Sequence, residues 1–537
     1  MTGGPRGHRK GTGKMKRIIR TTLTAAALFT AATAVHAQGD LVVGTIRDAV
    51  TLDPAVAVAT TDYIMMEAVY ERLVTYERTV DDEGNVTASM EFAPALATDW
   101  SVSDDGLTWT FQLREDVTFH DGTEFNAEAV RYSFARAITM GTGLSWQLSD
   151  ALTVDDIEVV SDHEIAFHLQ EPYAPFLEML RLPVASIVSP AAVEANGGVV
   201  AGQRNEWMIN NAVGTGPFVL KSRANDQLTV LEANPDYWGH GPELDTLSFR
   251  IVPDPATLRL LVSGREVHVV ALGLSWIDML DLEFMPGITV YKQEAFPEIR
   301  MGPFNVQQPP FDDKLVRQAV SYAVDYQSII DGVMLGQAVR LTSAIPEGTF
   351  GHDPSIVPYQ YDPERARELL AEAGYPDGFT FEFAYPSADQ ERFEVATVIQ
   401  ANLAAVGINA ELAGYAWPTL LEKWDTGDFT LSVGKWAPTG DPHARVYGLL
   451  GCDSWGNAGN YGQYCNPEVD RLMAAAVATV DPDERFALYS EMQQILMDDA
   501  PWLFLYQPVR GFPLTDDVRG FHIPPAETFA WQYVSLE

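Results

Sequence analysis

The sequence predicts a mixed α/β protein of more than one lobe, from its length, its alternation of strand and helix signals, and its helix-capping pattern. The chain has 537 residues. Removing the leader described below leaves about 500 residues, which is more than a single hydrophobic core supports. Segments of alternating polarity recur between amphipathic helices, and this alternation is typical of α/β layers. We find no internal repeat and no low-complexity tract.

Strand patterns dominate the first half of the chain. Residues 105–113 (DGLTWTFQL) alternate apolar and polar side chains, as a half-buried strand does. Asn126 then stands where a helix cap is expected, just before an amphipathic stretch. Residues 155–169 indicate a hairpin. Further strands are predicted at 41–49, 214–222, 226–239 and 243–252.

Helix signals are stronger in the second half. The apolar residues of 312–331 recur at three- and four-residue intervals, which predicts one helix with an apolar face. Asp362 is a predicted N-cap, Pro363 follows at the first helical position, and Gly374 is a predicted stop. The segment that begins at Asp481 repeats this capping pattern.

The N-terminus has the pattern of a secretory signal. Residues 1–37 hold seven Lys and Arg and no acid, and from Met15 the order is basic, weakly apolar, then small. We predict cleavage after Ala37. Gln38 stands where a lipoprotein needs Cys, so a free periplasmic protein is expected. No other run approaches the roughly 20 apolar residues of a membrane span, and we predict no membrane insertion.

The charge balance excludes some partners. Of the 35 Lys and Arg, 28 lie after residue 37 and face 74 Asp and Glu, so the net charge there is 28 − 74 = −46. Such a surface repels phosphate, and nucleic acid is therefore not an expected partner. Two interpretations stay open: a solvated acidic coat, as in a salty medium, or a cleft that attracts cations.

The two cysteines lie close together in the sequence. Cys452 and Cys465 are the whole inventory, in the segment GCDSWGNAGNYGQYCNP. In an oxidising compartment they predict a disulfide that closes a short loop, worth about 3 kcal/mol. A thiol nucleophile is the alternative. The spacing is not the CxxC type that would suggest a metal site.

Enzyme motifs are not found. HExxH is absent, and GLSWI at 273–277 lacks the last Gly of a nucleophile elbow. Gly214-Thr215-Gly216 is followed by Pro217, which fits the entry to a strand rather than a phosphate cradle. No cofactor is predicted. A secreted hydrolase stays an alternative from a different functional class.

Five landmarks carry a resemblance to a known family. In order they are HDGTEFNAEAVRYSFAR, GTGPFVLKS followed by NPDYWG, IVPDPATLRLLVSG, FDDKLVRQAVSYAVD and YDPERARELLAEAGYPDG. The chain resembles the extracellular solute-binding proteins of the peptide/nickel ABC importers, family 5. The landmarks span nearly all of the chain after residue 37.

The resemblance implies a large two-lobed periplasmic binding protein (type II, Venus-flytrap) with an extra N-terminal subdomain. Hinges are expected near 294–305 and near Gln507, where lobes move as rigid bodies. The implied division is a signal peptide at 1–37, lobe I at 38–75, 210–296 and 510–537, an inserted subdomain at 76–209, and lobe II at 297–509.

The implied function is transport without chemistry. A protein of this kind captures a small peptide or peptide-like solute between its lobes. It then presents the solute to inner-membrane ABC permease subunits driven by cytoplasmic ATPases. A monomer is expected. A nickel or metal-chelate binding protein of the same family is the alternative.

The resemblance places ligand-reading residues in one loop, KWAPTGDPH at 435–443. Trp436 occupies the family's aromatic position and could also be a core residue. Peptide-binding relatives have Asp three residues later to hold the ligand ammonium, where this chain has Thr439. Asp441 takes over that role, or the ligand lacks a free amino terminus. His443 resembles the histidine of nickel-binding relatives and is the metal ligand only under that alternative.

Three further residues complete the predicted ligand site: Trp146, Tyr63 and Arg300. Trp146 could be a pocket wall or a core residue. The residues just before it, GTGLS, include no basic side chain that could hold an anionic metal chelate. This absence, and the resemblance of the Cys452 to Cys465 loop to that of dipeptide-binding relatives, favour a peptide.

Overall fold

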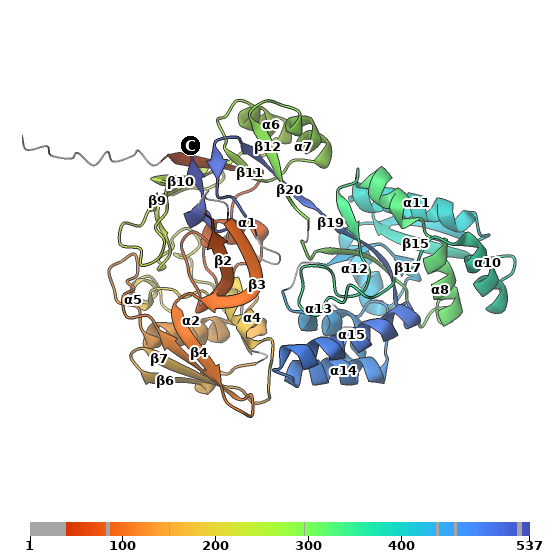
Figure 1. Cartoon of the computed structure of the whole chain (residues 1–537), viewed down its shortest axis with the longest axis horizontal. Coiled ribbons are helices and arrows are strands. Elements are labelled where there is room, and N and C mark those ends of the chain that lie inside the picture. The colour runs from red at the N-terminus through yellow and green to blue at the C-terminus, as the bar shows by residue number, and fades with distance from the viewer. Residues whose placement is uncertain are drawn as a thin grey trace, which may run out of the picture. The chain divides into compact units, whose positions relative to one another are not determined.

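The computed structural model (Figure 1) describes most of the chain after residue 38. The predicted signal peptide, its cleavage site and Thr439 lie outside the described residues. Within the described part, no helix combines the length and apolar character needed to cross a bilayer. The described residues are 39–81, 86–149, 151–294, 296–436, 440–455, 459–523 and 529–537.

A seven-stranded sheet is built from three separate stretches of the chain. Its strand order is β12-β20-β11-β1-β10-β9-β8, and β1 runs parallel to both neighbours. Buried Leu41, Val43, Phe249 and Trp531 pack in its core. The strands are β1 (Asp40–Thr45), β8 (Phe218–Ala224), β9 (Leu228–Ala233), β10 (Thr246–Ile251), β11 (Val269–Leu272), β12 (Ile288–Gln293) and β20 (Arg510–Thr515). Four strand predictions are confirmed here. The helices α6 (Pro255–Ser263) and α7 (Trp276–Glu283) lie beside this sheet (Figure 1).

A four-stranded antiparallel sheet has the order β4-β5-β7-β6 and packs on helix α2. The predicted strand at 105–113 and hairpin at 155–169 are confirmed. Asn126 caps α2 by accepting a hydrogen bond from the Ala129 amide, 3.0 Å away. The elements are β4 (Ala97–Val102), β5 (Thr108–Leu113), β6 (Ile157–Ser161), β7 (Glu164–His168) and α2 (Ala127–Met140). Nearby lie α1 (Thr60–Met66), β2 (Val74–Val80), β3 (Val86–Pro94), α3 (Trp146–Ser149), α4 (Phe176–Arg181) and α5 (Pro190–Ala195).

Two smaller sheets organise the stretch from Ile299 to Pro508. One is antiparallel, with the order β14-β19-β13-β18, and the other is parallel, with the order β16-β15-β17. A bridge between Phe304 and Leu431 links them. The strands are β13 (Ile299–Pro303), β14 (Ala338–Arg340), β18 (Gly434–Trp436) and β19 (Trp502–Pro508), with β15 (Thr380–Pro386), β16 (Asn409–Tyr415) and β17 (Leu431–Ser432).

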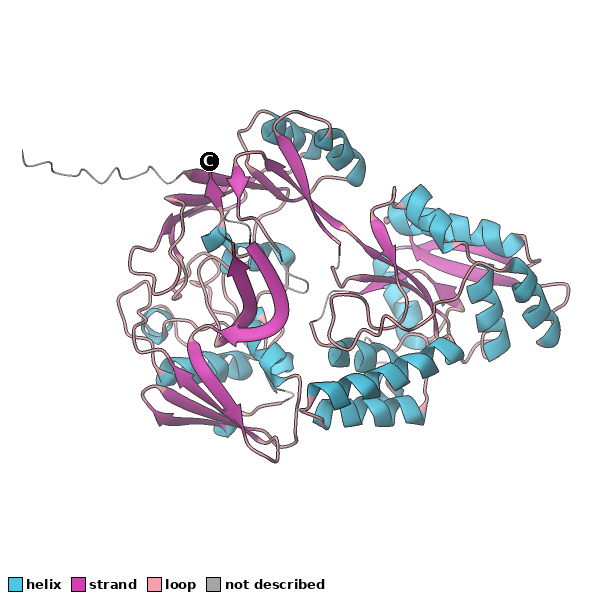
Figure 2. Ribbon diagram, in the orientation of Figure 1, coloured by secondary structure: helices cyan, strands magenta, loops and turns pink. Residues whose placement is uncertain are grey.

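Helices surround these two sheets (Figure 2). The predicted caps Asp362 and Asp481 accept amide hydrogen bonds at the starts of α10 and α15. Gly374 has a φ of +90°, which suits the predicted stop. The helices are α8 (Lys314–Ala323), α10 (Pro363–Glu372), α11 (Gln390–Ala404), α12 (Trp417–Thr426), α13 (Pro442–Leu450), α14 (Pro467–Ala478) and α15 (Pro482–Asp499).

The helix predicted within 312–331 is confirmed from Lys314 to Ala323, but it does not continue to Tyr326. Helix α8 ends at Ala323, and Val324 is extended with a ψ of 125°. Asp325 then caps a new short helix, α9 (Tyr326–Ser328), by accepting a hydrogen bond from the Ser328 amide. The local cap therefore overrides the apolar periodicity, which continues through the break.

The chain passes between the seven-stranded sheet and the β13–β19 sheet at two places. In the first sheet Gln293 of β12 pairs with Arg510 of β20, and in the second Arg300 of β13 pairs with Tyr506 of β19. The connections are residues 294–298 and Val509. The predicted hinges fall at these two crossings. The hinge motion and the division into lobes stay predictions.

Candidate functional site

Trp436 and Arg300 lie on neighbouring strands. Trp436 pairs with Ile299, and Lys435 pairs with Arg300. Trp436 is half-buried against the apolar cluster that also holds Ile299. The Arg300 guanidinium is buried, and it forms ion pairs with Glu298 and with Glu391, the latter at 2.5 Å. Burial works against the charged form of Arg300, but these carboxylates outweigh it and raise its pKa. The Arg300 charge is therefore balanced within the protein.

The parallel strands β15 and β16 end side by side, at Pro386 and Tyr415. Open α/β sheets bind ligands beyond the carboxyl ends of their parallel strands. Asp389 and Arg392 follow β15, and they are joined by a hydrogen bond of 2.9 Å. Trp417 follows β16, is 47% exposed, and lies under the Arg392 guanidinium at 5.5 Å.

Sequence reasoning missed Asp389, Arg392 and Trp417. The strand-like pattern of residues 380–386 (TFEFAYP) followed by an Asp cap is the signal that could have found this edge. Trp436 follows β17 of the same sheet by four residues. The carboxyl edge thus brings exposed aromatic surface close to paired charges.

Asp441 is committed to two structural contacts. It is the N-cap of α13 and accepts a hydrogen bond from the His443 amide at 2.8 Å. Its carboxylate also forms an ion pair with Arg485 at 2.7 Å, and both side chains are buried. Burial alone lowers the pKa of Arg485, but the Asp441 carboxylate outweighs it and raises that pKa. Sequence reasoning missed Arg485. The role of Asp441 as a counter-ion for a ligand stays a prediction.

His443 lies among aromatic rings. It stacks on Tyr447 with ring centroids 5.5 Å apart and meets the edge of Tyr173 at 6.2 Å. Burial lowers the pKa of His443, with Asp441 opposing and Arg485 adding to that shift. Among the described residues, no group of three or more His, Cys, Asp or Glu side chains is placed to hold a metal ion. The surroundings of His443 therefore favour its neutral form.

Tyr173 belongs to a segment that contacts the second half of the chain. The Ala174 amide donates a hydrogen bond to the Val477 carbonyl at 2.7 Å. The Glu178 carboxylate lies so close to Gly440 that an added Cβ there would come within 2.0 Å of an Oε1 atom. We call these contacts the 173–178 junction. Beside them is a cavity of about 290 Å³, lined by Glu171, Pro172, His443, Tyr447, Asp470 and Val477.

Trp146 and Tyr63 lie elsewhere in the described chain. Trp146 begins α3 and is 50% exposed. Tyr63 lies in α1, where its hydroxyl donates to the Ala57 carbonyl at 3.3 Å. Burial, with Asp62 next, raises the pKa of Tyr63. Tyr63 packs against the core of the seven-stranded sheet, whereas Trp436 packs against the cluster that holds Ile299, so the place of Tyr63 and Trp146 in one ligand site stays a prediction.

The predicted disulfide between Cys452 and Cys465 is confirmed. It spans the connection from α13 to α14, where Asn460 donates hydrogen bonds to the carbonyls of Gly451 and Tyr464. Asp470 of α14 accepts a hydrogen bond from the Cys452 amide at 3.2 Å. These contacts fix the connection between the two helices.

Comparison with known proteins gives consistent results. Residues 91–457 match the family described as bacterial extracellular solute-binding proteins, family 5 Middle. The chain is 32% identical to the probable D,D-dipeptide-binding periplasmic protein DdpA of Escherichia coli K12, over 95% of this chain and 98% of that protein. HbpA2 from Haemophilus parasuis superposes with a TM-score of 0.83 at 27% identity, covering 93% of this chain and 100% of HbpA2. The periplasmic binding protein DppA from Helicobacter pylori, in complex with the peptide STSA, gives 0.72 at 30% identity, covering 93% and 98%.

Proposed function

The chain belongs to the bacterial extracellular solute-binding proteins of family 5, and we propose that it captures a small peptide or peptide-like solute for an ABC importer. Relatives support the solute class, because the similar Escherichia coli protein is named for a dipeptide and the Helicobacter pylori structure holds a peptide. We propose that it acts in the periplasm as a monomer, and that inner-membrane permease subunits receive the solute.

One observation carries this proposal: the two chain crossings lie beside the candidate ligand residues. Trp436 pairs directly with β13, the strand that follows the first crossing. The second crossing, at Val509, directly follows β19, and β19 also pairs with β13. A body that turns about these crossings would close on a solute held at the carboxyl edge beyond β15 and β16.

In this proposal the site binds and performs no reaction. Trp417 and Trp436 offer flat apolar faces for a peptide side chain or backbone. Backbone groups are proposed to supply most of the hydrogen bonds to the solute. Asp441 contributes through its pair with Arg485, and Arg300 through its pair with Glu391. The remaining predicted residues, Trp146, Tyr63, Thr439 and His443, stand as proposed contacts.

A metal chelate is the second candidate ligand because of one ring nitrogen of His443. The Nδ1 atom of His443 is buried and has no hydrogen-bond partner among the described residues. A neutral imidazole nitrogen of this kind is a common metal ligand. His443 would have to bind the metal with ligands from the chelating molecule itself, as no other His, Cys, Asp or Glu cluster surrounds it in the described chain.

Thermal unfolding of refolded, ligand-stripped protein tests the proposal. Binding to the native state alone raises the melting temperature, by mass action. We expect the dipeptide Met-Leu or the peptide STSA to raise it, and each peptide to be recovered intact afterwards. Nickel with histidine is the parallel probe for the second candidate. If no peptide in a broad dipeptide and oligopeptide set shifts the transition, the proposal is wrong, and cleavage of the peptide would support the hydrolase alternative.

A further inference from the structure

The segment that joins β12 to β13 is held from three elements. Arg445 of α13 donates to the Pro297 carbonyl at 2.5 Å. Gln507 of β19 donates to the Phe296 carbonyl at 3.2 Å. The Arg510 guanidinium, at the start of β20, lies 4.5 Å over the ring of Phe296. Both chain crossings are therefore tied to one another at residues 296–298.

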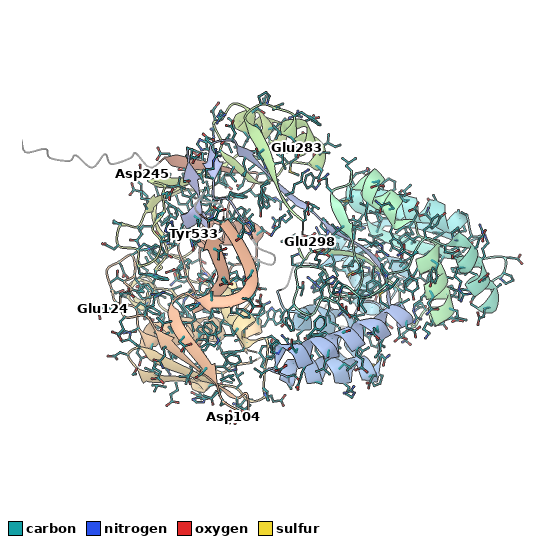
Figure 3. All side chains as sticks on the ribbon, in the orientation of Figure 1. Asp104, Glu124, Asp245, Glu283, Glu298 and Tyr533 are labelled. Atoms are coloured by element: carbon teal, nitrogen blue, oxygen red, sulfur yellow. A yellow bond between two sulfur atoms is a disulfide. The ribbon has the colours of Figure 1, made fainter. Side chains whose placement is uncertain are left out.

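Three arginines at this place need compensation for burial. Arg445 is 0% exposed and Arg300 is 6% exposed. A buried charge is costly unless a partner of opposite sign is near. Glu298 forms an ion pair with Arg300. Figure 3 shows Glu298 where the chain passes between the two sheets.

The same carboxylate acts on the other two arginines. Burial lowers the pKa of Arg445 to about 9, and Glu298 opposes that shift. Burial also lowers the pKa of Arg510, and Glu298 again opposes it. Glu298 is thus paired with Arg300 of β13, and it directly follows the two residues that Arg445 of α13 and Arg510 of β20 contact.

Arg445 connects this cluster to the candidate ligand loop. It lies in the helix that Asp441 caps, one turn after the cap. Asp441 is itself fixed by Arg485. Helix α13 therefore contacts the candidate site at its first residue and the crossing segment through Arg445.

We infer that Glu298 is a positioning residue for solute binding: it pairs with Arg300 next to the residues that Arg445 and Arg510 contact, and so holds α13 to the segment that joins β12 to β13. The effect on binding rests on the proposed function. The effect on the ligand-free protein does not, because the contacts that carry it are present without a solute.

The test compares Glu298→Gln with Glu298→Asp and with a control, Glu283→Gln. Glu283 lies on α7 and pairs with Lys292 near the surface, so its removal leaves the cluster intact. We expect Glu298→Gln to speed hydrogen exchange of the amides of 296–303 and 441–450 in ligand-free protein. We also expect it to raise the Kd for Met-Leu by about tenfold. Glu298→Asp should restore most of the slow exchange and most of the affinity. Glu283→Gln should match the wild type in both measurements.

A double-mutant cycle with Arg445→Met separates coupling from simple loss of packing. Changing both residues should cost less than the sum of the two single changes, because Arg445, the buried charge that Glu298→Gln leaves without this carboxylate, is absent from the double variant. If Glu298→Gln does not fold, the double variant can still be measured, because the double variant is expected to fold. Additive effects, an unfolded double variant, or exchange in Glu298→Gln equal to that of Glu283→Gln would overturn the inference. If the wild type binds no peptide, the proposed function fails while the exchange comparison still decides the role of Glu298.

Discussion

The ring of Tyr173 meets the ring of His443 edge to face, with centroids 6.2 Å apart and planes at 82°. These residues are far apart in the sequence. Tyr173 precedes α4, and His443 lies in the first turn of α13. The Ala174 hydrogen bond to Val477 lies next to this contact. The 173–178 junction is therefore a non-covalent connection in addition to the two chain crossings.

The junction should weaken in acid. Burial lowers the pKa of His443, so the proton binds more tightly when the junction opens and the ring meets water. The neutral form thus favours the closed junction, and this contribution is lost as the pH falls through about 6.5, the ordinary histidine pKa. We expect faster exchange of the Ala174 amide at pH 5.5 than at pH 7.5, after correction for intrinsic rates.

Other groups that face His443 do not reverse this sign. Asp441 is paired with Arg485, and Glu171 lines the cavity beside the ring. Burial raises the pKa of Asp470, which favours the closed junction in acid but acts at the lower pH of a carboxyl group. In His443→Gln the dependence between pH 7.5 and 5.5 should vanish. An unchanged dependence in this variant would show that another group is responsible.

Gly440→Ala should destabilise the protein by about 1 to 3 kcal/mol, the usual cost of overpacking. The new Cβ would come within 2.0 Å of the Glu178 carboxylate. That carboxylate cannot easily move, because it accepts a hydrogen bond from Tyr76 at 2.7 Å and pairs with Arg181. Urea unfolding measures the effect.

Gly448→Ala is the matched control for this change. Gly448 lies in α13, and an added Cβ there meets nothing within 4 Å. Alanine is about 1 kcal/mol more favourable than glycine inside a helix, so this variant should be at least as stable as the wild type. Equal stability of the two variants would show that Glu178 yields freely, and that the 173–178 junction is loose.

Local features of the fold could be predicted from the sequence. Asn126, Asp362 and Asp481 cap helices because a short acceptor side chain reaches the next amides in the chain. The hairpin at 155–169 could likewise be predicted, because its two strands are neighbours in the sequence. The helix predicted within 312–331 ends early, at Ala323, because two local signals conflict there and the cap at Asp325 prevails over the apolar period.

The charges of the candidate site could not be predicted in this way. Arg485 reaches Asp441 from another helix, and Glu391 reaches Arg300 across 91 residues of chain. The sequence has 74 acids, so an ion pair between distant residues has no signature in it. The carboxyl edge beyond β15 and β16 was missed for a different reason: the strand pattern at 380–386 was overlooked, and the edge forms only when that strand aligns with β16.

Loss of the Cys452–Cys465 disulfide should cost about 3 kcal/mol in the loop-entropy account. The bond closes a loop with a sequence separation of 13. The variant with both cysteines changed to Ser should unfold at lower urea than the wild type, and dithiothreitol should have the same effect on the wild type alone. A dithiothreitol effect on the double variant would point to another cause.

Asp441→Asn decides between a structural and a ligand-binding role for this carboxylate. If the pair with Arg485 is its main function, Asp441→Asn and Arg485→Met should each destabilise the ligand-free protein by roughly 3 to 5 kcal/mol, since each leaves a buried partner alone. Affinity for Met-Leu would then fall similarly in both variants. If Asp441 instead holds a ligand ammonium, Asp441→Asn should weaken binding by roughly 2 to 5 kcal/mol, well beyond the effect of Arg485→Met.

If the ligand is a metal chelate, His443 rather than Asp441 should contribute most to binding. His443→Ala should then abolish binding of nickel with histidine, while Asp441→Asn has a mild effect. For a peptide, His443→Ala should matter little, because its ring contacts Tyr173 and Tyr447 rather than a ligand ammonium. Calorimetric titration of both probes into both variants separates these cases. If neither substitution changes either affinity by about tenfold, or 1.4 kcal/mol, residues 436–443 do not determine specificity, and the carboxyl edge with Trp417 and Arg392 becomes the place to test.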